Sequence, residues 1–135
     1  MNARKINKTV TSISVLSFNN GERLSYTAPA YLLKDAEGFT LNYNEPGMQG
    51  IETALSFKNG RLLLSRSDGT RLTFEKDADT SGVYCMFCGV LDAEIKTSAL
   101  SFKEEGDKNV LSLCYELRMG GQDFSSKMKI TFPGC

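Results

Sequence analysis

The sequence predicts an all-β protein that folds as a single antiparallel up-and-down β-barrel. Apolar and polar residues alternate wherever a pattern is clear, which is the period of a strand with one buried face. Tight-turn residues separate these runs, and no stretch of about ten residues has the spacing of an amphipathic helix. About nine or ten strands result, and closure into a barrel removes exposed edges better than the alternative, a two-sheet β-sandwich.

The first strand is expected over residues 9–18, which are rich in Thr, Val, Ile and Ser. Ile13 and Leu16 lie in opposite phases of the alternation, and this favours a bulge or an edge position. A turn at residues 19–21 leads into the second strand, whose ladder Pro29 should interrupt because proline has no N–H.

Residues 38–75 predict a meander of consecutive strands. Its first strand has an apolar face that ends at Glu45, and the breakers in residues 46–50 precede the next strand. Asn59-Gly60 and Asp68-Gly69 then supply tight turns, because such pairs accept the positive φ that hairpin turns need. Successive strands should therefore run antiparallel.

The last third of the chain continues the alternation. Residues 83–88 form one run, and the strand that starts at Leu91 is expected to run on to Phe102 with a phase change. Residues 111–117 and 124–132 supply the last two inner faces.

The chain is expected to form one domain over residues 1–135, with its core in about residues 9–132 and a flexible segment at residues 1–8. A domain of this length buries about two thirds of the surface that its unfolded chain exposes. Neither a metal nor a disulfide is then needed for stability, and no cofactor is expected. We expect a monomer or a weak homodimer.

Charge and hydropathy exclude several classes of partner. The 16 basic and 16 acidic residues cancel, so the chain lacks the excess of positive charge that binds nucleic acids or anionic membranes. No apolar run approaches the roughly 20 residues of a membrane-spanning helix. The N-terminus alternates polar and apolar residues and lacks the continuous apolar segment of a signal peptide. A cytoplasmic protein is therefore expected.

The sequence contains no histidine, which excludes Ser-His and Cys-His nucleophiles, histidine metal ligands and imidazole acid–base chemistry. No two acidic residues share an apolar face in the alternation. Catalysis is therefore not expected, and a small hydrolase or isomerase that uses Glu45 is the least favoured of the functions considered.

Cys85 and Cys88 form a C-x-x-C pair, and with Cys114 and Cys135 they would complete a zinc site of four thiolates. Residues three apart on an extended strand, however, point to opposite faces and lie about 10 Å apart, beyond the roughly 7 Å Cα limit of a disulfide. Thioredoxin-type chemistry also needs a helix N-terminus in a βαβ unit. We expect four reduced, metal-free thiols.

Glu45 and Arg66 are opposite charges that the alternation places on an otherwise apolar inner face, each at or near a strand end. One interpretation is that both side chains extend to the barrel rim and cap it, and in the absence of a pocket this structural role is favoured. The other is a buried pair that orients a ligand with nearby polar groups. The polar groups in question belong to Tyr43, Thr53, Thr97 and Tyr115.

Several short motifs occur in a distinctive order: Tyr43-x-Glu45, a strand with Thr53, Leu64-x-Arg66-x-x-Gly69, Tyr84 before Gly89-x-Leu91, Thr97, and Tyr115-x-Leu117. Over about residues 10–132 this order resembles the YwiB-like family of small bacterial proteins. The resemblance implies a calycin-type, lipocalin-like barrel of unknown function and supplies no catalytic residues. Where the family has Thr-Pro-aromatic before a glycine, this chain has Met86-Phe87-Cys88, so no role of that segment is carried over.

The expected function is to bind a small, partly apolar molecule inside the barrel. The alternative is a packed scaffold barrel that acts through protein–protein contacts and holds no ligand. Most inner-face residues are large, and a barrel of about eight strands has room only for its own side chains or one small molecule. We therefore expect a modest cavity that opens near Glu45 and Arg66 rather than a lipid-sized cup.

Overall fold

A computed structural model of the protein describes residues 7–47, 50–86 and 89–134. These residues form a closed antiparallel barrel in which each strand pairs with its neighbours in sequence and the last strand pairs with the first. The predicted fold class is thus confirmed, and the sandwich alternative is not. The strands are β1 (Asn7–Asn19), β2 (Glu22–Lys34), β3 (Gly38–Asn44), β4 (Glu52–Lys58), β5 (Arg61–Arg66), β6 (Arg71–Glu75), β7 (Asp79–Met86), β8 (Gly89–Glu105), β9 (Lys108–Met119) and β10 (Gln122–Pro133).

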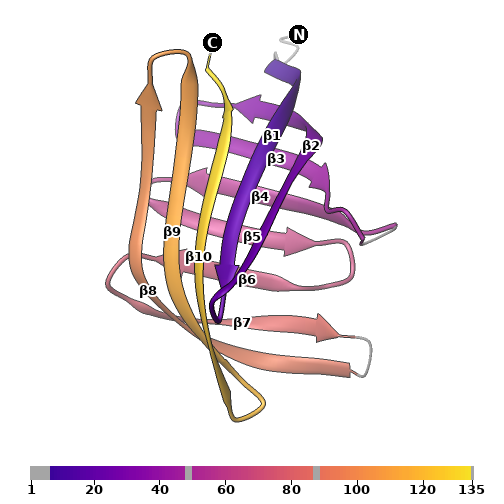
Figure 1. Cartoon of the computed structure of the whole chain (residues 1–135), viewed down its shortest axis with the longest axis vertical. Helices are drawn as coiled ribbons and strands as arrows, with labels where there is room; N and C mark the ends of the chain where they lie inside the picture. The colour runs from indigo at the N-terminus through magenta and orange to yellow at the C-terminus, as the bar shows by residue number, and fades with distance from the viewer. Residues whose placement is uncertain (1–6, 48–49, 87–88, 135) are drawn as a thin grey trace, which may run out of the picture.

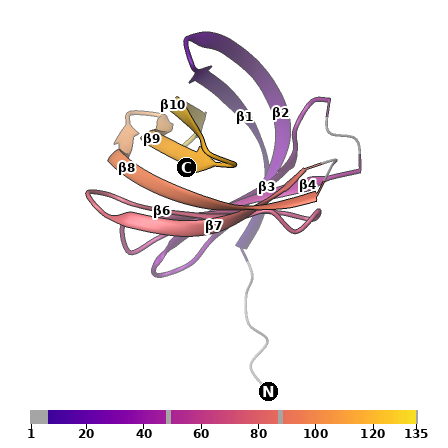
Figure 2. The ribbon, with the colours of Figure 1, turned by 90° about the horizontal axis from the view of Figure 1, so that it is seen from below.

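The barrel has two walls made of strands of different length. β3 to β7 contain five to eight residues each, whereas β1, β2, β8, β9 and β10 contain 12 to 17. Figure 1 shows the short strands crossing behind the long ones at a steep angle, and Figure 2 shows the chain curving around the interior from below. Steeply crossed sheets meet at corners, where strands bend from one wall to the other.

β8 forms one of these corners. It leaves β7 in one wall and turns to run beside β9 in the other (Figure 1). The register between β8 and β9 shifts between Thr97 and Ala99, so a bulge supplies the bend. The phase change predicted for this strand is thereby confirmed.

The first hairpin differs in part from the expectation. β1 pairs with β2 without a break from Asn7 to Asn19, so the predicted bulge is not present. β10 pairs only with residues 14–19 of β1, so residues 7–13 have a ladder on one side, and the predicted edge position is confirmed for that part of the strand. Apolar side chains on the outer face misled the prediction of a bulge, since Ile13 is buried while Phe18 is 40% exposed. Of the segment expected to be flexible, Asn7 and Lys8 belong to β1, and residues 1–6 lie outside the described residues.

Pro29 does not interrupt β2, which was also a wrong prediction. The residue pairs with Ser12 of β1 within a continuous ladder. On its other side the ladder between β2 and β3 begins only at Ala30. Pro29 thus lies at an edge of the β2–β3 ladder, a position where proline is tolerated in sheets.

Registers across β3, β4, β5 and β6 arrange the inner side chains of this wall in layers. The middle layer consists only of leucines that are between 0% and 5% exposed: Leu41, Leu55, Leu64 and Leu72. One adjoining layer is mainly aromatic: Phe39, Phe57, Leu62 and Phe74. The layer on the other side is polar and contains Tyr43, Thr53 and Arg66.

The aromatic end of the interior is filled by side chains from both walls. Phe39 lies within 4.8 to 5.8 Å, centroid to centroid, of the rings of Phe57, Phe102 and Phe132. Such tilted ring pairs add to the energy gained by burial. Aromatic side chains thus dominate this end of the barrel, whereas the buried ion pair of Glu45 and Arg66 lies at the other end. No helix in the described residues is long and apolar enough to cross a membrane.

Candidate functional site

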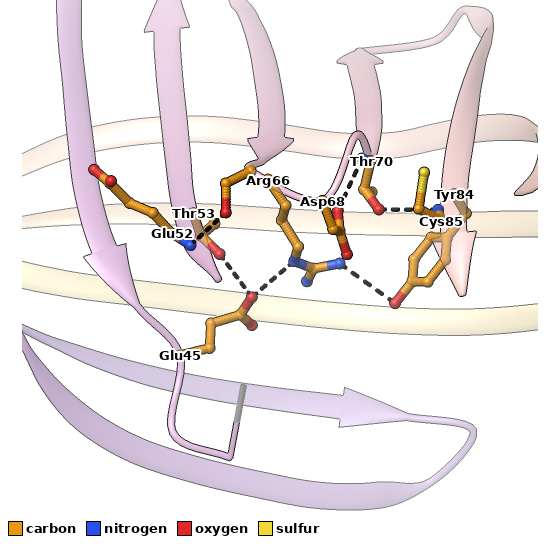
Figure 3. Close-up of polar contacts among 9 residues, drawn as sticks. Glu45, Glu52, Thr53, Arg66, Asp68, Thr70, Tyr84 and Cys85 are labelled. Carbon is orange, nitrogen blue, oxygen red and sulfur yellow. Dashed lines mark hydrogen bonds and ion pairs between the residues drawn. The ribbon is translucent and has the colours of Figure 1, made fainter. Parts of the chain in front are cut away.

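An ion pair occupies the centre of the polar layer. β3 ends at Asn44, and the next residue, Glu45, turns its carboxylate toward Arg66 at the end of β5 (Figure 3). Arg66 Nε donates to Glu45 Oε2 at 2.8 Å, and Thr53 Oγ1 donates to the same oxygen at 2.9 Å. The side chains of Glu45 and Arg66 are only 18% and 11% exposed. The buried-pair interpretation therefore describes the geometry better than a solvated rim.

Arg66 has a second partner on β7. Its Nη1 donates to the Tyr84 hydroxyl at 3.4 Å, and its guanidinium carbon lies 5.7 Å from the centre of the Tyr84 ring. Burial acts to lower the pKa of Arg66, but the charge and hydrogen bond of Glu45 outweigh it, so the pKa of Arg66 is raised. The guanidinium is therefore a permanent cation held between a carboxylate and a phenol.

Two further tyrosines extend the network toward β2. Burial, followed by the negative charge of Glu45, raises the pKa of Tyr26 to about 12. The side chain of Tyr43 acts in the opposite direction and lowers the pKa of Tyr26, so both Tyr43 and Glu45 lie near its hydroxyl. Burial also raises the pKa of Tyr43, and Tyr26 adds to this effect. Both phenols therefore stay protonated and keep their O–H groups as donors.

The facing wall brings Tyr115 and Thr97 to the same interior. The two residues are cross-strand partners on β9 and β8. Burial raises the pKa of Tyr115 against the effect of a hydrogen bond with Ser126, and the charges of Arg66 and Glu45 also act on it. Thr97 is 3% exposed, and its Oγ1 has no hydrogen-bond partner among the described residues.

The six residues proposed from the sequence thus divide into two groups. Glu45, Arg66, Thr53 and Tyr43 are joined directly by hydrogen bonds or strand register. Tyr115 and Thr97 lie on the opposite wall. The charges of Glu45 and Arg66 affect the pKa of Tyr115, but no hydrogen bond joins it to either residue among the described contacts. The ring of Tyr115 packs on Phe74 of the aromatic layer at 4.7 Å, and Thr97 lies beside Lys76, so the structure brings only the first four residues together.

Sequence reasoning missed Tyr26, Tyr84 and Ser126. Tyr26 lies two residues before Ala28 and therefore has the same inward phase in the strand. This phase could have identified Tyr26 as a site residue. Tyr84 lies in the opposite phase to Val83 and Cys85 in a run without a clear apolar face. Its contact with Arg66 depends on how β7 lies beside the polar layer, which no local pattern reports.

Glu45 and Arg66 line none of five hollows in the described residues, although their neighbours Tyr26 and Tyr43 each line one. One hollow of about 460 Å³ includes Thr97, Tyr115 and Ser126 in its lining, next to the charged residues Lys96 and Lys127. The cavity expected beside the ion pair remains a prediction.

Two of the four cysteines can be placed. Cys85 and Cys114 are half-buried free thiols. Cys88 and Cys135 lie outside the described residues, so the geometry of the C-x-x-C pair does too. Within the described residues, no group of three or more His, Cys, Asp or Glu side chains is arranged to hold a metal ion.

Comparisons with known proteins agree with this architecture. Residues 9–131 match a family model described as a domain of unknown function, DUF1934. The fold is similar to the crystal structure of the ywiB protein from Bacillus subtilis, with a TM-score of 0.81 and 22% sequence identity over 96% of this chain and 95% of that chain. At this identity the likeness shows the fold alone. None of the curated proteins matches the sequence. The resemblance read from the short motifs is confirmed, and the chain belongs to the DUF1934 family.

Proposed function

We propose that the protein binds a small molecule at the polar end of its barrel and catalyses no reaction on it. The observation that carries this proposal is the convergence of Glu45, Arg66 and the tyrosine hydroxyls inside an otherwise apolar interior. Small-molecule sites combine mostly apolar walls with a few well-placed polar groups that fix the orientation of the ligand. The polar layer has this composition, and the leucine layer beneath it supplies the apolar floor.

The supply of hydrogen-bonding groups supports binding over a purely structural role. Arg66 has five N–H donors, and two of them donate to described side chains, one to Glu45 and one to Tyr84. The other N–H groups of Arg66 supply donors for a ligand carboxylate or carbonyl.

The second candidate function is a scaffold that acts through protein contacts. It is favoured by the outer face of the first hairpin, where Val10 and Tyr31 are cross-strand neighbours and are 74% and 46% exposed. Exposed apolar neighbours are typical of surfaces that other proteins cover. On this hypothesis the interior is only a packed core, and the protein is a monomer or weak homodimer that meets another protein through this hairpin.

Native mass spectrometry separates the two functions. Protein purified without denaturation should carry a bound small molecule, and Arg66→Met should lose it. Arg61→Met is the matched control because Arg61 forms an ion pair with Glu75 at 60% and 44% exposure, away from the polar layer. This control should retain the bound mass.

Circular dichroism of each variant shows whether loss of the ligand reflects loss of the fold. A wild-type protein that carries no small molecule, together with binding partners recovered through Val10 and Tyr31, would favour the scaffold. Equal retention of the bound mass by Arg66→Met and Arg61→Met would place the ligand away from the polar layer.

A further inference from the structure

The groups around Glu45 have the chemistry of a carboxylate-binding site that is already occupied by a carboxylate of the chain. We propose that the ligand is a small monocarboxylate that replaces the Glu45 side chain on Arg66 and Thr53. This inference rests on the proposed function and adds to it the chemical class of the ligand.

The donors of this site are preformed. Arg66 Nε and Thr53 Oγ1 both donate to the single oxygen Oε2 of Glu45, at 2.8 and 2.9 Å. Thr53 is paired on both sides, with Tyr43 and with Arg66. The backbone of Arg66 is also held on its other side, since its N–H donates to the carbonyl of Thr70 at 2.9 Å. The positions of the donors therefore do not depend on Glu45.

The acceptor is held less firmly than the donors. Glu45 follows the last paired residue of β3, which is Asn44, and no ladder pair fixes its backbone. Its side chain is 18% exposed, so rotation about its own bonds brings the carboxylate into water. The exposed residues Pro46 and Gly47 follow it. An incoming carboxylate would compete with one tethered side chain rather than with a rigid part of the sheet.

Charge defines the class of ligand that can make this exchange. Arg66 is 11% exposed and positively charged, and leaving it without an anion would be costly. A neutral molecule could displace Glu45 only by leaving this cation unpaired. A singly charged planar carboxylate balances the one guanidinium and matches its geometry. Tyr26 and Tyr84 supply phenol groups beside the same position.

The opposite wall contributes Tyr115 to the surroundings of the pair. The charges of Arg66 and Glu45 act on this phenol, whose ring packs on Phe74 at 4.7 Å, centroid to centroid. Its cross-strand partner Thr97 lies beside Lys76, past the end of β6 that is opposite to Arg66. The exchange therefore involves Arg66, Thr53 and the phenols around them, and not Thr97.

Chemical rescue tests the exchange directly. The Glu45→Ala variant removes the resident carboxylate, and sodium acetate or formate should restore its stability. Melting temperature is measured against sodium chloride at equal ionic strength. Acetate at ten times its Kd should raise the melting temperature of Glu45→Ala by roughly 4 °C more than chloride does. The double variant Glu45→Ala/Arg66→Met should lose this difference.

Glu75→Ala is the matched control, because it removes a carboxylate from an exposed arginine pair. It should respond equally to acetate and chloride. An equal response of Glu45→Ala to both salts would overturn the proposal. If Glu45→Ala folds only when acetate is present, that requirement is itself the rescue.

If Glu45→Ala folds in neither salt, the wild-type protein decides the question by NMR. The Arg66 Nε–H resonance should then move saturably with acetate and not with chloride, and an unmoved resonance would overturn the exchange. The test is independent of the proposed function. If acetate rescues Glu45→Ala but native wild-type protein carries no small molecule, the carboxylate exchange is supported and the proposed function is refuted. If the native protein carries a neutral small molecule and acetate does not rescue Glu45→Ala, the exchange is refuted and the proposed function is supported.

Discussion

A single buried cation governs the energetics of the polar end. Arg66 is 11% exposed and is hydrogen-bonded to Glu45, so removal of the carboxylate leaves a charge in a poorly solvated position. Breaking such a pair is far more costly than replacing both partners with apolar residues of similar size. A single substitution at residue 45 or 66 should therefore cost more stability than substitution of both residues together.

We predict that Glu45→Ala lowers the free energy of unfolding by about 3 kcal/mol and that Glu45→Leu/Arg66→Met recovers much of this loss. Urea denaturation measures both. The exposed pair is the control, and Arg61→Ala should cost less than about 1 kcal/mol. Strictly additive effects of the single and double substitutions at residues 45 and 66 would show that the pair makes no net contribution.

The tyrosines give a prediction for alkaline pH. The pKa of Tyr26 is raised to about 12 in the folded protein, whereas an unfolded tyrosine ionises near 10. A raised pKa means that the folded state holds the proton more tightly. The stabilisation is therefore complete below about pH 10 and is lost as the pH rises from about 10 to 12.

Tyrosine absorbance followed against pH, together with urea midpoints between about pH 8 and 12, measures this effect. Tyr26→Phe should reduce the alkaline loss of stability, since it removes the ionising hydroxyl. The raised pKa values of Tyr43 and Tyr115 act in the same direction. Ionisation of every tyrosine near pH 10 while the protein is still folded would contradict the buried network.

At the scale of elements, the seam between β6 and β7 is held by side chains in place of a full ladder. Its strand register contains one pair, Arg71 with Val83. Cys85 N donates to Thr70 Oγ1 at 3.0 Å, and Thr80 Oγ1 donates to the carbonyl of Thr73. Hydroxyl groups thus replace backbone partners on the side of the barrel next to Tyr84.

A glycine allows the two strands to approach at this seam. A Cβ atom on Gly82 would lie 2.4 Å from the carbonyl oxygen of Arg71. We predict that Gly82→Ala lowers the free energy of unfolding by about 1–3 kcal/mol because the strands must separate. Hydrogen exchange should rise in β6 and β7 before the rest of the barrel.

Ser81→Ala is the control for Gly82→Ala, since Ser81 is the exposed neighbour on the same strand. It should leave the exchange rates in β6 and β7 unchanged. Equal stability of Gly82→Ala and Ser81→Ala would show that the close approach at the seam is not required for the fold.

The elements that the sequence predicted correctly are those whose information is local. The alternation and the Asn59-Gly60 and Asp68-Gly69 turns were sufficient for β3 to β6 and for the inward phase of Glu45 and Arg66. The errors in β1 and β2 arose where the outer face is apolar or where proline tolerance depends on a neighbouring strand. The inward phase of Tyr26 was available from local spacing, whereas the contact of Tyr84 with Arg66 depends on how β7 lies beside β6 and β5, which local spacing does not encode.

At the scale of the whole molecule, the interior is divided along its length. Phenylalanines from both walls fill one end, leucines fill the middle, and charged and phenolic groups gather at the other end. The strand registers bring Arg66 beside Glu45 and Tyr84, which are distant in sequence, in the polar layer. Under the proposed function, the ligand binds at the polar end.

A crystal structure of protein purified without denaturation tests binding at the polar end most directly. The proposed exchange predicts electron density for a small molecule beside Arg66, with a carboxylate oxygen within hydrogen-bonding distance of both Arg66 Nε and Thr53 Oγ1. A solidly packed polar layer without added density, or a long apolar chain running through the leucine layer, would contradict it.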